Sequence, residues 1–273
     1  MAFTTHTKQD MVYLASSHLP GVAHGFSTRK GGVSSAPWDS LNLRPGQGDG
    51  PIALEENYRR FCGALGVCYD TVVLSHQVHE TTVREVSRED AGKGLWQPRD
   101  YTADALITRE SGLTLFVFSA DCGIILLHDP ASGAIGAVHA GWRGCAAGIV
   151  EKTVKEMHLR YGTNPRDLRA AIGPAIGPCC FETDSDVPAA MTAALGGDAK
   201  PYITPRGNKW YVDLSGLNRQ WLLRAGLSAE QIDVSPLCTA CHQDLFWSHR
   251  KVGDARGVQA GAICCPVREE AAP

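Results

Sequence analysis

The sequence predicts an α/β protein. Short apolar segments typical of strands alternate with segments of helical periodicity, and turns rich in Gly and Pro separate them. No internal repeat, low-complexity linker or shift in composition divides the chain, so we expect residues 1–273 to form a single domain. A chain of this length can bury roughly three quarters of its unfolded surface. It therefore needs no disulfide framework to fold.

The first helix and the strand after it are expected between residues 53 and 79. In ALEENYRRFCGALG, apolar residues recur at helical spacing, and Gly66 supplies a stop. TVVLSHQVH follows and is rich in β-branched residues, which favours a strand that carries His76 and His79 at its C-terminal end. Side chains three residues apart on a strand point to opposite faces. We therefore expect only one of the two histidines to face a site.

Two further strands are expected to end at chemically reactive residues. LTLFVFSADC is a continuous apolar run of the kind that is buried on both faces of a sheet, and it ends at Asp121 and Cys122. After the turn DPASG, the segment AIGAVHA predicts a strand that ends at His139. GWRG then leads into an amphipathic helix, which Gly162 and Pro165 terminate. Open α/β sheets bind ligands at the ends of such neighbouring strands.

The last third of the chain predicts the remaining elements. LRAAIG and, later, IDVSPLCT and VQAGAICC are expected to be strands. A turn rich in Gly and Pro, GPAIGPCC, follows the first of them. A helix is expected from Asp213 onward, because Leu214, Leu217 and Trp221 recur at helical spacing.

Composition and charge exclude several kinds of partner. The 26 basic and 29 acidic residues give a formal net charge of −3, and no basic block is present to neutralise a nucleic-acid backbone. The longest apolar runs are far shorter than the ~20 residues that cross a bilayer, and the N-terminus lacks the apolar run of a signal peptide. We therefore expect a cytoplasmic protein that binds neither nucleic acid nor a membrane. Its ten cysteines are then expected to be reduced thiols.

Three residues at expected strand ends, His79, Cys122 and His139, form a candidate metal site. Two imidazoles and one thiolate suit zinc, and three protein ligands instead of four leave a coordination position for water or substrate. The alternative for each histidine taken alone is a packed core residue. All three residues lie beside small or polar neighbours, which favours the metal site. An open coordination position predicts catalysis rather than a structural role.

Several nearby residues are candidates to bind an anion or to move a proton. In HAGWRG, two glycines and Arg143 stand at a strand-to-helix turn, an arrangement that suits phosphate. Arg29 in FSTRKGGVSS offers a similar loop, and the alternative for both segments is a tightly packed turn. Asp121 is a candidate for proton transfer. Because adjacent side chains on a strand point apart, Asp121 can instead orient a metal ligand, and Asp104 is a comparable case.

The segment CTACH, from Cys238 to His242, matches the attachment signature of c-type haem and also half of a zinc site. Covalent haem requires export, for which the chain shows no signal, and the second CxxC of a four-cysteine zinc site is absent. We therefore expect no haem. FWSHR, just downstream, carries His249 and Arg250 and is typical of the wall of a substrate pocket, with a solvated loop as the alternative.

A set of motifs in this order resembles the laccase-domain family, also called YfiH-like proteins. The motifs span nearly the whole chain and are HGFSTRKGGVS with SLNL, QVH, ADAL, SADCGIILLHDPASGAIGAVHAGWRG, AAIGPAIGPCCFE and CTACHQDLFWSHR. The resemblance implies a single α/β/α-layered sandwich domain with a mixed sheet, related to the catalytic domain of cytotoxic necrotising factor. Glu80 replaces the glycine that many members have after QVH, and DAR at Arg256 lacks the glycine of the family's TGR pattern. These departures leave the fine substrate preference open.

The resemblance also implies a function. Members of the family are associated with zinc-dependent phosphorolysis of adenosine, inosine, guanosine and methylthioadenosine, with deamination of adenosine, and with removal of a wrongly incorporated L-serine from a peptidoglycan precursor. Their metal ligands map onto His79, Cys122 and His139. We expect zinc rather than copper, a purine nucleoside and phosphate as small-molecule partners, and a monomer or weak dimer. Catalysis is assigned to Cys122, His139 and Asp121, and substrate or phosphate binding to Arg29, Asn42, Arg143, His249 and Arg250.

Other chemistries remain open. In the zinc hypothesis, bound water with a pKa lowered towards ~7 attacks C6 of adenosine, while phosphorolysis requires phosphate held against C1′. In a second hypothesis Cys122 is a thiolate nucleophile with His139 as base, in an amide hydrolase that edits a peptidoglycan precursor. A copper polyphenol oxidase is the third, but copper centres of that kind need more histidines in HxH pairs than this chain provides. An electron-transfer or metal-storage module built on CTACH is a non-enzymatic alternative.

Overall fold

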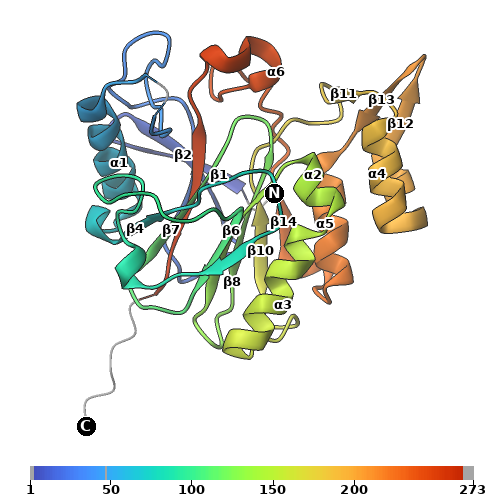
Figure 1. The fold of residues 1–273 in the computed structure, drawn as a ribbon, viewed down its shortest axis with the longest axis horizontal. Coiled ribbons are helices and arrows are strands. Elements are labelled where there is room, and N and C mark those ends of the chain that lie inside the picture. The colour runs from blue at the N-terminus through green and yellow to red at the C-terminus, as the bar shows by residue number, and fades with distance from the viewer. Residues whose placement is uncertain (1–2, 47, 267–273) are drawn as a thin grey trace.

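Two six-stranded β-sheets pack face to face between layers of helices in the computed structural model, which describes residues 3–46 and 48–266 (Figure 1). The first sheet has the order β1-β2-β3-β15-β7-β4. In it, β4 runs parallel to β7 and the other neighbours are antiparallel. Its strands are β1 (Phe3–Lys8), β2 (Met11–Ser16), β3 (His24–Ser27), β15 (Gln259–Cys264), β7 (Thr114–Ser119) and β4 (Val72–Leu74).

The second sheet is also mixed and has the order β14-β10-β8-β9-β6-β5. Its outer pairs, β14 with β10 and β6 with β5, are parallel, whereas the central strands are antiparallel. Its strands are β14 (Ile232–Val234), β10 (Arg169–Ile172), β8 (Gly123–His128), β9 (Ile135–Ala140), β6 (Ala105–Thr108) and β5 (Val83–Glu85). The predicted α/β class with mixed sheets is therefore confirmed, and the sheet layer is double.

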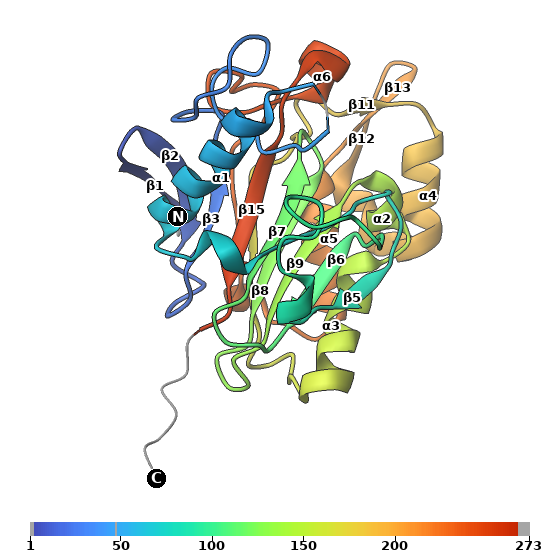
Figure 2. The same ribbon diagram turned by 60° about the vertical axis from the view of Figure 1, so that its left-hand side comes forward.

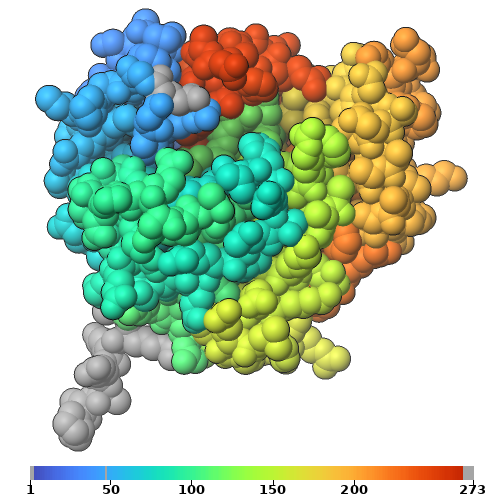
Figure 3. All heavy atoms as spheres, in the orientation of Figure 1, coloured from blue at the N-terminus to red at the C-terminus, as the bar shows by residue number. Residues whose placement is uncertain are grey.

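Helices cover the outer faces of the two sheets. α1 (Pro51–Leu65) lies on the first sheet, while α3 (Ile149–Tyr161) and α5 (Leu214–Arg224) lie on the second, at the opposite side of the molecule (Figures 1 and 2). A third sheet, β11 (Glu182–Thr183), β13 (Lys209–Val212) and β12 (Ile203–Arg206), projects beside α4 (Asp186–Leu195). Two short helices, α2 (Trp142–Ala146) and α6 (His249–Val252), complete the set. Figure 3 shows that the segment between β4 and β6, coloured teal, covers much of one face.

Alternation along the central strands explains why both sheets are buried on both faces. In β7, Leu115 and Val117 pack into the core between the sheets, whereas Phe116 packs under α1. In β8, Ile124 and Leu126 face the first sheet, and the intervening Ile125 and Leu127 face the helices. Because successive strand residues point to opposite faces, an unbroken apolar run fills two cores at once.

The helix boundaries follow the glycines that the sequence analysis singled out, with one difference. Gly66 ends α1 and Gly162 ends α3, both in the left-handed conformation at φ 74° and 69°. The single helix expected after His139 is two helices, because Gly148 adopts a φ of 73° and breaks it between α2 and α3. Within the described residues, none of the helices combines the length and the apolar character needed to cross a membrane.

The strand expected to end at Cys122 is shorter than predicted. β7 ends at Ser119, and the chain crosses from the first sheet to the second in a turn where Asp121 has a φ of 95°. Cys122 directly precedes β8, which was not predicted as a strand of its own. Since β8 and β9 are antiparallel, the start of one and the end of the other lie at the same edge.

Candidate metal centre

The structure brings His79, Cys122 and His139 together. One nitrogen of each imidazole and the Cys122 Sγ atom lie within 4.8 Å of one another. The two rings are nearly perpendicular, with centroids 4.9 Å apart. His79 comes from the loop after β4, Cys122 from the turn before β8, and His139 from the end of β9. These three residues are called the triad below.

A buried carboxylate orients His139. The Nδ1 atom of His139 lies 2.9 Å from Oδ1 of Asp104, and the two side chains are 2% and 0% exposed. Because Nδ1 is occupied by this contact, Nε2 is the ring nitrogen left to face the other two members of the triad. An imidazole held in this way by a carboxylate is typical of zinc ligands.

The same carboxylate also shapes the loop that carries His79. The backbone N–H groups of Val78, His79 and Glu80 each donate to Asp104 at 3.0 Å. His79 has a φ of 63°, a conformation that these bonds stabilise. Burial opposes ionisation of Asp104, but the hydrogen bonds from His139 and from this backbone outweigh it and lower the pKa of the carboxyl. Asp104 thus links two members of the triad.

In the absence of a metal, Cys122 and His139 form a charged pair. Burial opposes ionisation of the thiol, but the charge of His139 and hydrogen bonds from both histidines lower the pKa of Cys122 to about 6. Burial also opposes protonation of His139, yet the thiolate and Asp104 raise its pKa to about 9. The centre therefore concentrates negative charge on sulfur where a cation would bind.

The backbone at Gly141 passes close to the triad. A Cβ atom added to Gly141 would lie 3.1 Å from Sγ of Cys122 and 3.1 Å from Cδ2 of His79. Two imidazole nitrogens and one thiolate are soft to intermediate donors, a set that suits zinc and leaves a fourth coordination position. The triad therefore fits a zinc ion by donor chemistry and by mutual distance.

Two pockets meet at the triad. The first, of about 370 Å³, is lined by Arg44, Arg99 and Arg256 and is called the arginine pocket. The second, of about 340 Å³, is lined by Trp142 and Phe181 and is called the aromatic pocket. Its wall also includes the apolar side chains of Ile176 and Leu214. The two pockets share four residues, namely His79, Ala120, Cys122 and Arg256.

The arginine pocket is suited to an anion. Burial and the neighbouring charge of Arg256 lower the pKa of Arg44, and burial lowers that of Arg256. Nε of Arg256 is buried and has no hydrogen-bond partner among the described residues. Guanidinium groups that repel one another and retain an unused donor favour an oxyanion such as phosphate.

His76 and His79 both line the arginine pocket, so the expectation that only one of them faces the site is wrong. β4 ends at Leu74, before either histidine, and the alternation of a strand therefore does not apply to them. Burial and the charge of Arg99 lower the pKa of His76 to about 4. His76 is therefore neutral near pH 7.

Asp121 lies in the wall of the aromatic pocket, and three donors bind its carboxylate. They are Oγ1 of Thr239 at 2.6 Å, Oγ of Ser248 at 3.1 Å and the backbone N–H of Arg250 at 2.7 Å. The geometry points to Asp121 as the residue that ties these loops to the turn before β8.

Three residues chosen from the sequence as anion ligands are not among those that line either pocket. The guanidinium of Arg29 donates to the carbonyl oxygens of Asp39 and Gln243 and stacks on Trp247. Asn42 is fully buried and bonds to Asp49 and to the backbone of Arg44 and Val258. Arg143 is exposed and stacks on Trp142.

His249 and Arg250 do line the aromatic pocket. Arg250 also donates to the carbonyl oxygens of Cys180 and Glu182, at 3.0 Å each. Arg44 and Arg99 were not predicted as pocket residues. Arg256 was noted only because the segment DAR lacks the glycine of the family's TGR pattern. Arg44 directly follows the SLNL motif, which could have marked it, whereas Arg99 lies in a loop without a motif.

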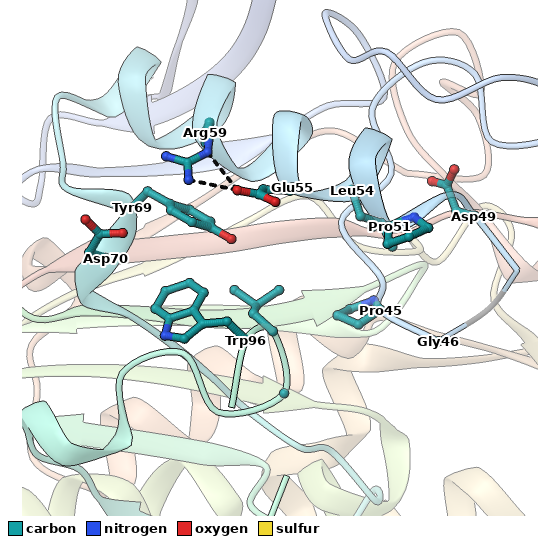
Figure 4. A pocket seen from close by; sticks show the side chains of 12 residues that line it. Pro45, Gly46, Asp49, Pro51, Leu54, Glu55, Arg59, Tyr69, Asp70 and Trp96 are labelled. Atoms are coloured by element: carbon teal, nitrogen blue, oxygen red, sulfur yellow. Dashed lines mark hydrogen bonds and ion pairs between the residues drawn. The ribbon is translucent and has the colours of Figure 1, made fainter. Parts of the chain in front are cut away.

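Another hollow, of about 600 Å³, lies away from the triad between α1 and the loop that carries Trp96. Figure 4 shows the aromatic rings of Tyr69 and Trp96 facing its interior, with the ion pair of Arg59 and Glu55 above them. None of the triad lines it.

Comparison with known proteins gives concordant results. The model of a family described as multi-copper polyphenol oxidoreductase laccase matches residues 23–266. Purine nucleoside phosphorylase YlmD of Geobacillus stearothermophilus is 35% identical over 237 residues, which cover 85% of each chain. A purine nucleoside phosphorylase of Deinococcus radiodurans is 36% identical over 248 residues, 91% of each chain.

Solved structures resemble this one along almost its full length. The crystal structure of YlmD from Geobacillus stearothermophilus superposes with a TM-score of 0.90 at 32% identity, covering 97% of this chain and 99% of that one. The crystal structure of the Bacillus licheniformis protein YfiH gives a TM-score of 0.89 at 30% identity, with the same coverage.

Proposed function

Because the chain belongs to the multi-copper polyphenol oxidoreductase laccase family, with relatives named purine nucleoside phosphorylases, we propose that it is a zinc-dependent purine nucleoside phosphorylase. Its substrates are then adenosine, inosine, guanosine or methylthioadenosine, together with phosphate. Deamination of adenosine is a second reaction of the same centre. We expect a single domain to carry both reactions, because the two sheets pack around a common apolar core.

The observation that carries this proposal is the meeting of two unlike pockets at the triad. The aromatic pocket offers the rings of Trp142 and Phe181 to a purine, which has a flat apolar face. The arginine pocket offers three guanidinium groups to phosphate. A nucleoside whose base occupies the aromatic pocket would place C1′ near the junction, within reach of a phosphate in the arginine pocket.

Phosphorolysis breaks the bond between C1′ and N9 and forms a bond between C1′ and a phosphate oxygen. The base leaves with the electron pair and takes up a proton. Arg44 and Arg256 would hold the phosphate and neutralise its charge as it approaches C1′. The triad would hold a zinc ion, which supplies Lewis-acid polarisation to a substrate oxygen or nitrogen. Asp104 would keep His79 and His139 in place throughout.

A direct test incubates the zinc-reconstituted protein with adenosine, with and without phosphate. Adenine and ribose 1-phosphate that form only with phosphate support phosphorolysis, and inosine that forms without it supports deamination. The absence of all three products contradicts the proposal. Removal of zinc by a chelator and its return measure whether the activity depends on the metal.

A second candidate function has its own supporting observation. Cys122, His139 and Asp104 form a chain of thiol, imidazole and carboxylate, the arrangement of a nucleophile, its base and the group that orients the base. This chain suits an amide hydrolase acting on a peptidoglycan precursor. Such an enzyme would keep its activity after chelation, whereas the zinc proposal expects the activity to be lost. It would also be inactivated by alkylation of Cys122 without prior removal of metal, whereas the zinc proposal expects bound zinc to protect this thiolate.

Copper-based phenol oxidation is the least supported candidate. Two histidines and one cysteine also match a blue-copper centre, which adds a weak axial methionine, glutamine or backbone oxygen, but multicopper oxidases need more histidines in HxH pairs than the chain provides. Zinc has no redox chemistry of its own. Assay of the zinc-loaded protein with a phenol substrate should therefore detect no oxidation.

A further inference from the structure

We propose that Cys179, Cys180, Cys238 and Cys241 bind a second zinc ion, in a closed structural site that is separate from the triad. The four Sγ atoms lie within 4.8 Å of one another. All four cysteines are free thiols, and none of them is a member of the triad. This inference goes beyond the proposed activity and does not depend on it.

Two segments distant in the chain supply the ligands in pairs. The adjacent Cys179 and Cys180 lie in the turn after β10, whereas Cys238 and Cys241 follow β14. β10 and β14 are parallel neighbours, and an isolated parallel bridge between Ala175 and Cys238 extends their pairing. Both pairs of thiols therefore emerge at the same edge of the sheet. The adjacent cysteines supply the ligands that a second CxxC would otherwise provide.

The distances favour a metal over a disulfide. Sγ of Cys241 lies 3.5 Å from Sγ of Cys179 and 3.4 Å from Sγ of Cys180. A disulfide joins two sulfurs at about 2.05 Å, so Cys241 could pair with only one of these two neighbours. A single ion uses all four thiolates at once.

The distances also favour a single ion of the size of zinc. Four Zn–S bonds of about 2.3 Å in a tetrahedron place the sulfur atoms about 3.8 Å apart. The four thiols already lie within 4.8 Å, and the two contacts of Cys241 need to open by only a few tenths of an ångström. The thiolates of an iron–sulfur cluster surround several atoms and would stand further apart.

The surrounding backbone is arranged to support a thiolate. The N–H of Gly177 donates to Sγ of Cys238 at 3.2 Å, and the Cys238 side chain is 6% exposed. A Cβ atom added to Gly177 would lie 3.3 Å from Cβ of Cys238 and 3.4 Å from Sγ of Cys179, so the turn passes closely over both ligands. The guanidinium of Arg250 donates to the carbonyl oxygen of Cys180 and places a positive charge beside the cluster.

The site would stabilise one wall of the aromatic pocket. Ile176 and Phe181 lie within the segment that carries the first pair of cysteines, and both line that pocket. Thr239, between the second pair, donates to Asp121 in the turn that leads to Cys122. A zinc ion at the four cysteines would therefore tie the pocket wall to the turn beside the triad without touching substrate.

Metal content of purified protein tests the proposal first. We expect the variant C238S/C241S to contain one zinc ion fewer per chain than the wild type. The matched control C68S, at an exposed cysteine outside the cluster, should retain the wild-type content. Unchanged zinc in a folded C238S/C241S protein would overturn the proposal. The single variant C179S, at an exposed cysteine, gives the same comparison if the double variant does not fold.

X-ray absorption at the zinc edge gives a second test that leaves the cluster intact. In the C122S protein, where the triad has lost its thiolate, the remaining tightly bound zinc should show four sulfur neighbours at about 2.3 Å and no imidazole scattering. A nitrogen-rich shell or absence of zinc would exclude the site. Peptide mapping under non-reducing conditions would exclude it equally if it found a disulfide from Cys241 to Cys179 or Cys180.

Discussion

Oδ1 of Asp104 lies 2.9 Å from Nδ1 of His139, and the same carboxylate accepts the backbone N–H of His79. One buried side chain thus fixes the ring of one candidate metal ligand and the loop that carries another. Neither contact uses the atoms that would face a metal. Asp104 is therefore expected to govern the affinity of the centre for zinc without being a ligand itself.

Replacement of Asp104 by Asn should weaken zinc binding by about 10- to 100-fold, because the amide carries fewer acceptor sites and cannot hold the same tautomer of His139. Titration of the metal-free protein with zinc measures the effect. D129N is the matched control, since Asp129 is also buried and bonds to Ser132 in the turn at the opposite end of β8. Equal loss of affinity in both variants would contradict this role for Asp104.

The backbone at Gly141 predicts a steric effect on the centre. A methyl group there would press against Cys122 and His79, so G141A should lower zinc affinity by about an order of magnitude. G63A provides the comparison, because a Cβ atom at Gly63 meets nothing within 4 Å and alanine favours the helix. The idea fails if G141A binds zinc as tightly as the wild type.

The lining of the arginine pocket predicts which arginine side chains bind phosphate. R256Q should raise the KM for phosphate at least about tenfold, because an unsatisfied charged donor contributes about 1.5–3 kcal/mol when it finds its partner. R143Q removes an exposed guanidinium outside the pocket and should change that KM less than about twofold. Steady-state kinetics with varied phosphate distinguish the two. If R143Q raised the KM for phosphate more than R256Q, Arg143 would be the phosphate ligand, as predicted from the sequence.

The sequence predicts the triad and the C-terminal ends of α1 and α3, because each of these depends on a local pattern. His79, Cys122 and His139 each lie in a recognisable motif, and Gly66 and Gly162 end their helices where the pattern predicts. No local sequence pattern predicts that the fold contains two packed sheets instead of one. An apolar run buried on both faces looks the same whether helices or a second sheet cover it.

The pocket residues show where sequence reasoning ends. Arg29 and Arg143 lie in glycine-rich loops of the kind that bind phosphate, yet neither lines the two pockets at the triad. Arg29 stacks on Trp247, and Arg143 stacks on Trp142, which belongs to the wall of the aromatic pocket. Arg44 and Arg99 line the arginine pocket because the tertiary fold brings their loops together, and only Arg44 lies next to a motif, SLNL. Cys179 and Cys180 likewise gain a partner pair only through the neighbouring strands β10 and β14.

The charged pair of Cys122 and His139 predicts a pH dependence in the metal-free protein. The pKa of the Cys122 thiol is lowered to about 6, so the reactive thiolate should be present above that pH and should disappear as the pH falls through it. The rate of alkylation of Cys122 by iodoacetamide, measured by peptide mass spectrometry, should therefore be half-maximal near pH 6. C68S removes an exposed competing thiol and simplifies the measurement.

Two comparisons make this prediction specific to the triad. In D104N the imidazolium of His139 loses its carboxylate partner, so its pKa should fall, and the midpoint of Cys122 alkylation should move to higher pH. Zinc should protect Cys122 at every pH in the range, because a thiolate bound to a metal is a poor nucleophile towards iodoacetamide. If Cys122 in the zinc-loaded protein reacted as fast as in the metal-free protein, the thiolate would not be a ligand, and the hydrolase with Cys122 as nucleophile would become the better account of this site.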